Sequence, residues 1–90
     1  MAKRKEASMN EFEYTITDEN GVHARPAGLI VRQAQKYDFD IVISCNGKTE
    51  NLKKLLALMG MGIKKGDTVK VSAPEGKDIS KLLNFFKENL

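Results

Sequence analysis

The stretch 40-DIVISCNGKTE-50 decides the fold, because it holds a strand, a tight turn and a returning strand. Residues 40–45 are mostly apolar and predict a strand. Asn46-Gly47 is the strongest two-residue signal for a β-hairpin. Residues 48–50 are then the returning strand. The stretch therefore predicts an antiparallel hairpin inside a sheet.

On the N-terminal side of this hairpin the sequence predicts one strand and one helix. Residues 11–17 alternate between apolar and polar side chains, as a half-buried strand does. Residues 18–21 have turn chemistry. From residue 24 to about 36 the period becomes helical, with Pro26 in the first turn, where a missing N–H costs nothing. The apolar face of this helix is Ala27, Ile30, Val31 and Ala34.

On the C-terminal side we expect a short helix, a strand and a last helix. Residues 54–60 predict the short helix, which Gly60 and Gly62 can end because glycine takes the left-handed conformation cheaply. Residues 68–72 alternate as a strand, and residues 78–89 have helical spacing. The order is β-α-β-β-α-β-α. Helices with one apolar face each predict an α+β fold, with the helices on one side of the sheet and solvent on the other.

Length and composition predict one small domain. The chain has 90 residues, and no apolar run approaches the roughly 20 residues that span a bilayer, so no membrane insertion is expected. The basic start lacks the apolar stretch of a secretory signal. A single cysteine, Cys45, cannot form an intrachain disulfide, and we expect it to be a structural strand residue. These features favour a cytoplasmic protein.

The net charge of +3 comes mostly from residues 1–8, which we expect to be a flexible basic extension ahead of a domain at 9–90. Without them the chain has 12 basic and 11 acidic residues. A nucleic-acid-binding function would rest on this extension alone, because the domain has no basic stripe interleaved with aromatic residues. We therefore expect no nucleic-acid partner.

His23, the only histidine, is the candidate for chemistry. It lies just before the predicted helix, where the first backbone N–H groups, near Ala24 and Arg25, have no partner inside the helix. These groups and the helix dipole favour a bound anion, and Arg25 adds a donor suited to phosphate. A neutral imidazole has a lone pair for nucleophilic attack. The junction thus favours a phosphoryl acceptor, although a histidine here can also be a simple cap or surface residue. A lone histidine makes a poor metal site, so no metal or cofactor is expected.

The stretch 21-GVHARPA-27 resembles the phosphorylation motif of HPr, the histidine-containing phosphocarrier of the bacterial phosphoenolpyruvate-dependent sugar phosphotransferase system. Residues 36–38, 46–48 and 51–63, and Gly66, are also similar to that family. The resemblance covers about residues 11–90. It implies an open-faced sandwich, a four-stranded antiparallel sheet covered by three helices.

The resemblance also implies a function. His23 would be phosphorylated on Nδ1 by enzyme I and would pass the phosphate to enzyme II A components, as a monomeric relay rather than an enzyme. Arg25 matches the arginine that steadies the phosphate, and Ala24 and Arg25 supply backbone N–H groups. Three side chains of the second helix match the partner-docking surface, and we expect at least Leu55 or Leu56 to be exposed, because so short a helix cannot bury them all. They are Leu55, Leu56 and Met59.

Two positions depart from the family pattern. Many HPr proteins have a regulatory serine at the start of the second helix, where this chain has Lys54, which cannot accept a phosphate. Gly28 replaces a common alanine or threonine and weakens the helix by about 0.5–1 kcal/mol. Lys54 and the extension leave a second hypothesis open, an HPr-like regulatory paralogue that binds a partner without relaying sugar phosphate.

Overall fold

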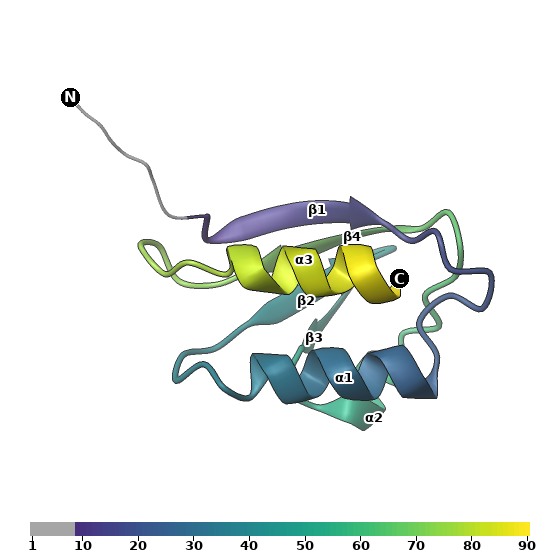
Figure 1. Ribbon diagram of the computed structural model, residues 1–90, viewed down its shortest axis with the longest axis horizontal. Coiled ribbons are helices and arrows are strands. Elements are labelled where there is room, and N and C mark those ends of the chain that lie inside the picture. Colours follow the sequence, from purple (N-terminus) through teal and green to yellow (C-terminus); the bar gives the residue numbers. More distant parts are fainter. Residues whose placement is uncertain (1–8) are drawn as a thin grey trace.

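The computed structural model describes residues 9–90 as a four-stranded antiparallel sheet and three helices, in the predicted order (Figure 1). The expected extension at 1–8 lies outside the described residues. The elements are β1 (Glu11–Thr15), α1 (Ala24–Ala34), β2 (Val42–Cys45), β3 (Lys48–Asn51), α2 (Leu55–Met59), β4 (Thr68–Ser72) and α3 (Ser80–Asn89). No helix in this part of the chain is long and apolar enough to cross a membrane.

The strand order is β1-β4-β2-β3, so the strands made first and last along the chain lie side by side. The predicted hairpin is confirmed: Cys45 pairs with Lys48, which leaves a two-residue turn. Asn46 and Gly47 have φ values of 53° and 81°, the two positive angles that a type I′ turn requires. In the centre of the sheet Val71 of β4 pairs with both Phe12 and Ile43, which holds β1 and β2 in register.

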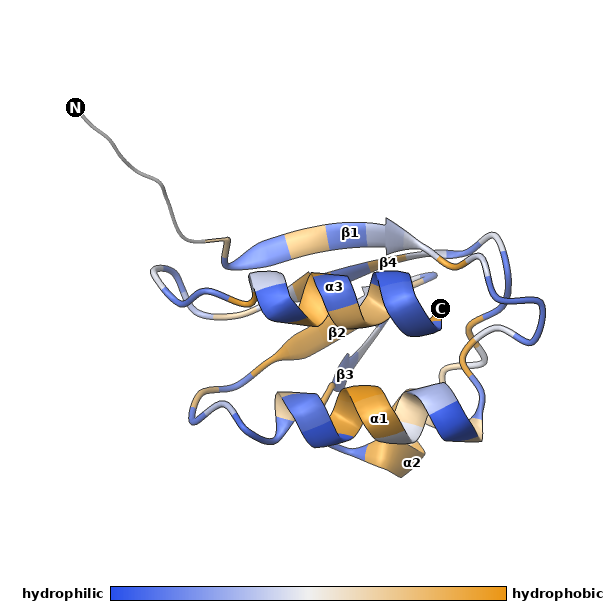
Figure 2. Ribbon diagram, in the orientation of Figure 1, coloured by the Kyte–Doolittle hydropathy of each residue, from blue (hydrophilic) through white to orange (hydrophobic). Residues whose placement is uncertain are grey.

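All three helices cover one face of the sheet, as Figure 1 shows. The predicted face of α1 is buried, and its middle and β2 stand out as apolar in Figure 2. Leu82 and Phe86 of α3 are also buried, and the Phe86 ring packs edge-on against Phe12, 5.5 Å between centroids. The opposite sheet face is open to solvent and carries charges, such as Lys70 Nζ 3.7 Å from Glu11 Oε2. The predicted open-faced α+β architecture is confirmed.

Several elements are shorter than the sequence predicts, and hydrogen bonds explain two of the differences. β1 ends at Thr15, because the backbone of Ile16 bonds to the loop at Gly66 and Asp67 instead of continuing the ladder. α3 begins at Ser80 rather than residue 78, because the Asp78 carboxylate accepts the Ser80 amide at 3.1 Å and lies outside the helix. α1 ends at Ala34 instead of about residue 36, and β2 begins at Val42 instead of residue 40.

Gly60 ends α2 as predicted, but the left-handed backbone expected for it is not found. Gly60 caps α2 with a right-handed φ of −68°, and the left-handed position is Gly62, with φ of 66°. The amide of Gly60 still bonds to the carbonyl of Leu56, and the Met61 amide bonds to that of Leu58. The helical turn therefore extends past Gly60, and the chain reverses two residues later.

Candidate functional site

His23 is the N-cap residue of α1, with an extended backbone at φ −116° and ψ 177°. Its carbonyl accepts the amide of Ala27 at 2.9 Å, the first bond of the helix. Its side chain makes no capping hydrogen bond. The backbone of His23 therefore starts the helix while the imidazole, 38% exposed, stays available for chemistry.

The loop before His23 is pressed against the segment that follows α2. The amide of Val22 donates to the carbonyl of Ile63 at 3.0 Å. Gly21 has φ of 65°, and a Cβ atom there would lie 2.8 Å from Lys64 Cα. This position therefore requires glycine, both for its left-handed backbone and for the space. The close contact fixes the direction from which the chain enters α1.

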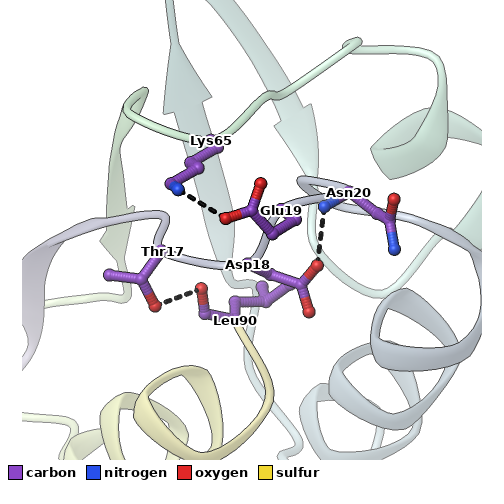
Figure 3. Close-up of polar contacts among 6 residues, drawn as sticks. All are labelled: Thr17, Asp18, Glu19, Asn20, Lys65 and Leu90. Carbon is purple, nitrogen blue, oxygen red and sulfur yellow. Dashed lines mark hydrogen bonds and ion pairs between the residues drawn. The ribbon is translucent and has the colours of Figure 1, made fainter.

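The same loop is anchored at its other end by Leu90, as Figure 3 shows. The carbonyl of Leu90 accepts the amides of Thr17 and Asp18 at 2.6 and 2.7 Å and the Thr17 hydroxyl at 2.9 Å. Farther along, the Lys65 ammonium lies 2.7 Å from the Glu19 carboxylate. The segment between β1 and α1 is thus held from both sides, by residues distant in sequence.

The first turn of α1 offers free backbone donors beside His23. Among the described residues, neither the Ala24 nor the Arg25 amide donates a hydrogen bond to the protein, and Pro26 has no N–H. The Arg25 side chain is exposed. Unpartnered amides at the positive end of a helix dipole, with a guanidinium nearby, form a surface suited to a phosphate dianion. The three predicted residues His23, Ala24 and Arg25 lie together at the start of α1.

Asp18 joins this group, although no pattern in the sequence marked it as a site residue. Its Oδ1 atom lies 3.6 Å from Nε2 of His23, and the side chain is 29% exposed. The sequence assigned Asp18 only to the turn. The available signal was its place five residues before His23, at the opposite end of one short loop.

α2 presents apolar side chains to solvent. Leu55, Leu56 and Met59 are 38%, 84% and 37% exposed, whereas Leu58 is buried. The expected exposure of Leu55 or Leu56 is confirmed. The helix α1 contacts α2, and Leu29 of α1 is also 40% exposed. The sequence analysis did not single it out, although it falls outside the predicted buried face.

Lys54 is the N-cap of α2, and its side chain makes no capping hydrogen bond. A neighbouring turn compensates: the Asn51 carboxamide accepts the Lys53 amide at 2.8 Å. The Lys53 ammonium in turn reaches the Tyr37 carbonyl at 2.7 Å, which ties the start of α2 to the end of α1. Lys54 is thus an exposed lysine at the helix start.

Two other features lie away from this site. A groove of about 480 Å³ runs between α1 and α3, but its lining begins at Gln33, at the opposite end of α1 from His23. The Cys45 thiol is buried, and burial together with the Asp67 carboxylate raises its pKa. Within residues 9–90, no three histidine, cysteine, aspartate or glutamate side chains gather as a metal site would require.

The fold and site define an open-faced α+β protein with a half-exposed histidine at the N-cap of α1. The model of one family, described as the PTS HPr component phosphorylation site, matches residues 10–89. The chain belongs to this HPr family.

Solved structures support the assignment. The histidine-containing phosphocarrier protein of Mycoplasma is 35% identical, with 88% of this chain and 89% of that one aligned and a TM-score of 0.75. The phosphocarrier protein HPr of Bacillus anthracis is 30% identical, with 89% and 94% covered and a TM-score of 0.73. Crh of Bacillus subtilis, a catabolite repression protein described as a swapped dimer, is 24% identical, with 100% and 97% covered and a TM-score of 0.62, and shares the fold.

Proposed function

We propose that this chain relays phosphate in a sugar phosphotransferase system. His23 accepts a phosphoryl group from phospho-enzyme I and passes it to enzyme II A components. The observation that carries the proposal is the imidazole of the N-cap, which makes no capping hydrogen bond, beside an exposed Arg25 and two amides that have no partner within residues 9–90. The protein is a cytoplasmic carrier that is modified and restored, and it has no turnover of its own.

The relay needs a nucleophile and a place for its product. The lone pair of Nδ1 attacks phosphorus, a P–N bond forms, and the bond from phosphorus to the donor breaks with its electron pair left on the donor. The product places a dianion at the start of α1. The Ala24 and Arg25 amides and the Arg25 guanidinium stabilise it there, because each donates to or neutralises the phosphate oxygens. Transfer to the next protein reverses these steps.

The exposed side chains of α2 fit a docking role. Leu56 is 84% exposed, and burying an apolar side chain of this size against a partner stabilises the complex. Leu55 and Met59 are partly exposed beside it. We assign all three to the surface that contacts enzyme I and the enzyme II A components.

A labelling experiment tests the relay. The protein is incubated with radiolabelled phosphoenolpyruvate and enzyme I, and acid-labile protein-bound phosphate is measured. We expect one phosphate per chain, lost completely in His23→Ala. In Arg25→Ala labelling should slow by roughly tenfold, the effect of losing one charge-assisted contact to the transferring group. Labelling that survives in His23→Ala would refute the proposal.

The alternative is a regulatory paralogue that binds a protein without passing on sugar phosphate. This alternative is motivated by Lys54 at the N-cap of α2 and by the basic extension at residues 1–8. Complementation discriminates between the two, because a relay restores sugar uptake in a strain that lacks its phosphocarrier and a regulatory paralogue does not. Sedimentation of the purified chain separates the monomer that we expect from a dimer of the kind described for Crh.

A further inference from the structure

Asp18 approaches the imidazole of His23 at the nitrogen that would not carry the phosphate. The distance from Asp18 Oδ1 to His23 Nε2 is 3.6 Å. This is longer than a hydrogen bond, but such contacts are often long in an unliganded site and tighten in the reacting complex. Glu19, the next carboxylate along the loop, is paired instead with Lys65. Asp18 is thus the acidic group placed to act on the ring.

The backbone around Asp18 fixes its carboxylate independently of His23. The Asp18 amide donates to the Leu90 carbonyl at 2.7 Å, and its own carbonyl accepts the Gly21 amide at 2.9 Å. Oδ1 also accepts the Asn20 amide at 2.8 Å (Figure 3). A residue whose backbone is held by two hydrogen bonds and whose carboxylate accepts a third loses little further freedom when it binds a neighbour, so Asp18 is preorganised to orient a mobile ring.

We propose that Asp18 is a positioning residue for phosphoryl transfer at His23, a role that rests on the proposed function. The Asp18 carboxylate accepts a hydrogen bond from the N–H group at Nε2, and this contact selects the tautomer with its lone pair on Nδ1. As the P–N bond forms, Nε2 keeps its proton and the ring becomes positively charged. The adjacent carboxylate stabilises that charge, as carboxylates beside imidazolium rings do elsewhere. When the phosphoryl group leaves, the electron pair of the P–N bond returns to Nδ1.

Two variants of Asp18 and one control separate charge from structure. Asp18→Asn removes the charge but keeps an oxygen that can accept the Asn20 amide. Asp18→Ala removes both. Glu19→Gln makes the same charge change one residue away, at a side chain that is 83% exposed and paired with Lys65.

The first measurement is nitrogen-15 NMR of His23 in the unphosphorylated protein, with the ring neutral. The wild type should show Nε2 protonated and Nδ1 unprotonated. In Asp18→Ala both nitrogen shifts should move toward the averaged values of a free imidazole, and Glu19→Gln should leave them unchanged. Identical shifts in wild type and Asp18→Ala would overturn the proposal. This measurement uses no phosphoryl donor, so its outcome is independent of whether the relay proposal holds.

The second measurement is the rate of phosphoryl transfer from phospho-enzyme I. Asp18→Asn should be slower by roughly three- to tenfold, less than for a fully buried carboxylate because the pair is partly exposed to solvent. Its thermal unfolding should match that of the wild type. A rate equal to that of wild type, or an equal slowing in Glu19→Gln, would overturn the positioning role. Absence of labelling in the wild type would refute the relay instead.

Discussion

Gly21 lies so close to Ile63 that a Cβ atom on Gly21 would be 2.4 Å from the Ile63 carbonyl oxygen. Backbone is on both sides of this contact, so no side chain can rotate away to relieve it. The contact also brings the Val22 amide to the same carbonyl. The path of the loop that carries His23 therefore depends on Gly21 having no side chain.

Gly21→Ala should destabilise the fold by about 2–4 kcal/mol, because it combines a left-handed alanine with a backbone clash. Gly62→Ala is the matched control, since Gly62 has nearly the same φ, 66°, and open space around its Cβ position. The control should lose only about 1–2 kcal/mol. Urea denaturation measures both. Equal losses in the two variants would show that the contact with Ile63 does not constrain the loop.

Leu56 and Leu58 lie on one short helix and should respond in opposite ways. Leu56→Ser changes an 84% exposed side chain, so the free energy of unfolding should stay within about 0.5 kcal/mol of wild type. Its KM as a substrate of enzyme I should rise severalfold. Leu58→Ala opens a cavity in the core and should cost about 2–5 kcal/mol. An unchanged KM in Leu56→Ser would remove this residue from the proposed docking surface.

Gly28→Ala should stabilise the protein. Nothing lies within 4 Å of the Cβ position, so the added methyl group fits without displacement. Alanine in the middle of a helix is favoured over glycine by about 0.5–1 kcal/mol. Thermal unfolding should show a higher midpoint, and phosphorylation of His23 should continue. A lower midpoint would contradict the expectation that the added methyl group fits without displacing its neighbours.

Asp78 should make stability depend on pH. Hydrogen bonds from the Met9 and Ser80 amides hold the pKa of this carboxyl below its ordinary value of 3.8. Because the pKa of Asp78 is lower in the folded than in the unfolded state, ionisation of this carboxyl stabilises the fold at pH values above the unfolded-state pKa. That contribution is lost as the pH falls through the folded-state pKa. Asp78→Asn should therefore be less stable than wild type near about pH 7, and the difference should shrink near about pH 2.5. A gap of the same size at both pH values would exclude the charged carboxylate as its source.

Local signals predicted most of the fold. The Asn46-Gly47 turn fixed the hairpin, and the spacing of Ala27, Ile30 and Val31 marked the buried face of α1. These features depend on neighbours in sequence, so one chain suffices to find them. The ends of elements were less predictable. Thr15 is the last residue of β1 because Ile16 bonds to the distant Asp67, a contact that no local pattern encodes.

The site shows the same division. The placement of His23 before a helix followed from sequence, because Pro26 and the apolar period define where α1 starts. The relation of Asp18 to His23 did not, since it depends on the path of the loop. That path is set by Ile63 and Leu90, which are far along the chain.

The strand order has a consequence for synthesis on the ribosome. β1 emerges early but pairs with β4, which is made much later, at roughly 5–20 residues per second. The loop that presents His23 can be fixed in place only later still, because Thr17 and Asp18 are hydrogen-bonded to Leu90. A nascent chain thus carries its histidine on an unanchored segment. A partner that recognises the assembled loop is offered its substrate only once synthesis has reached Leu90.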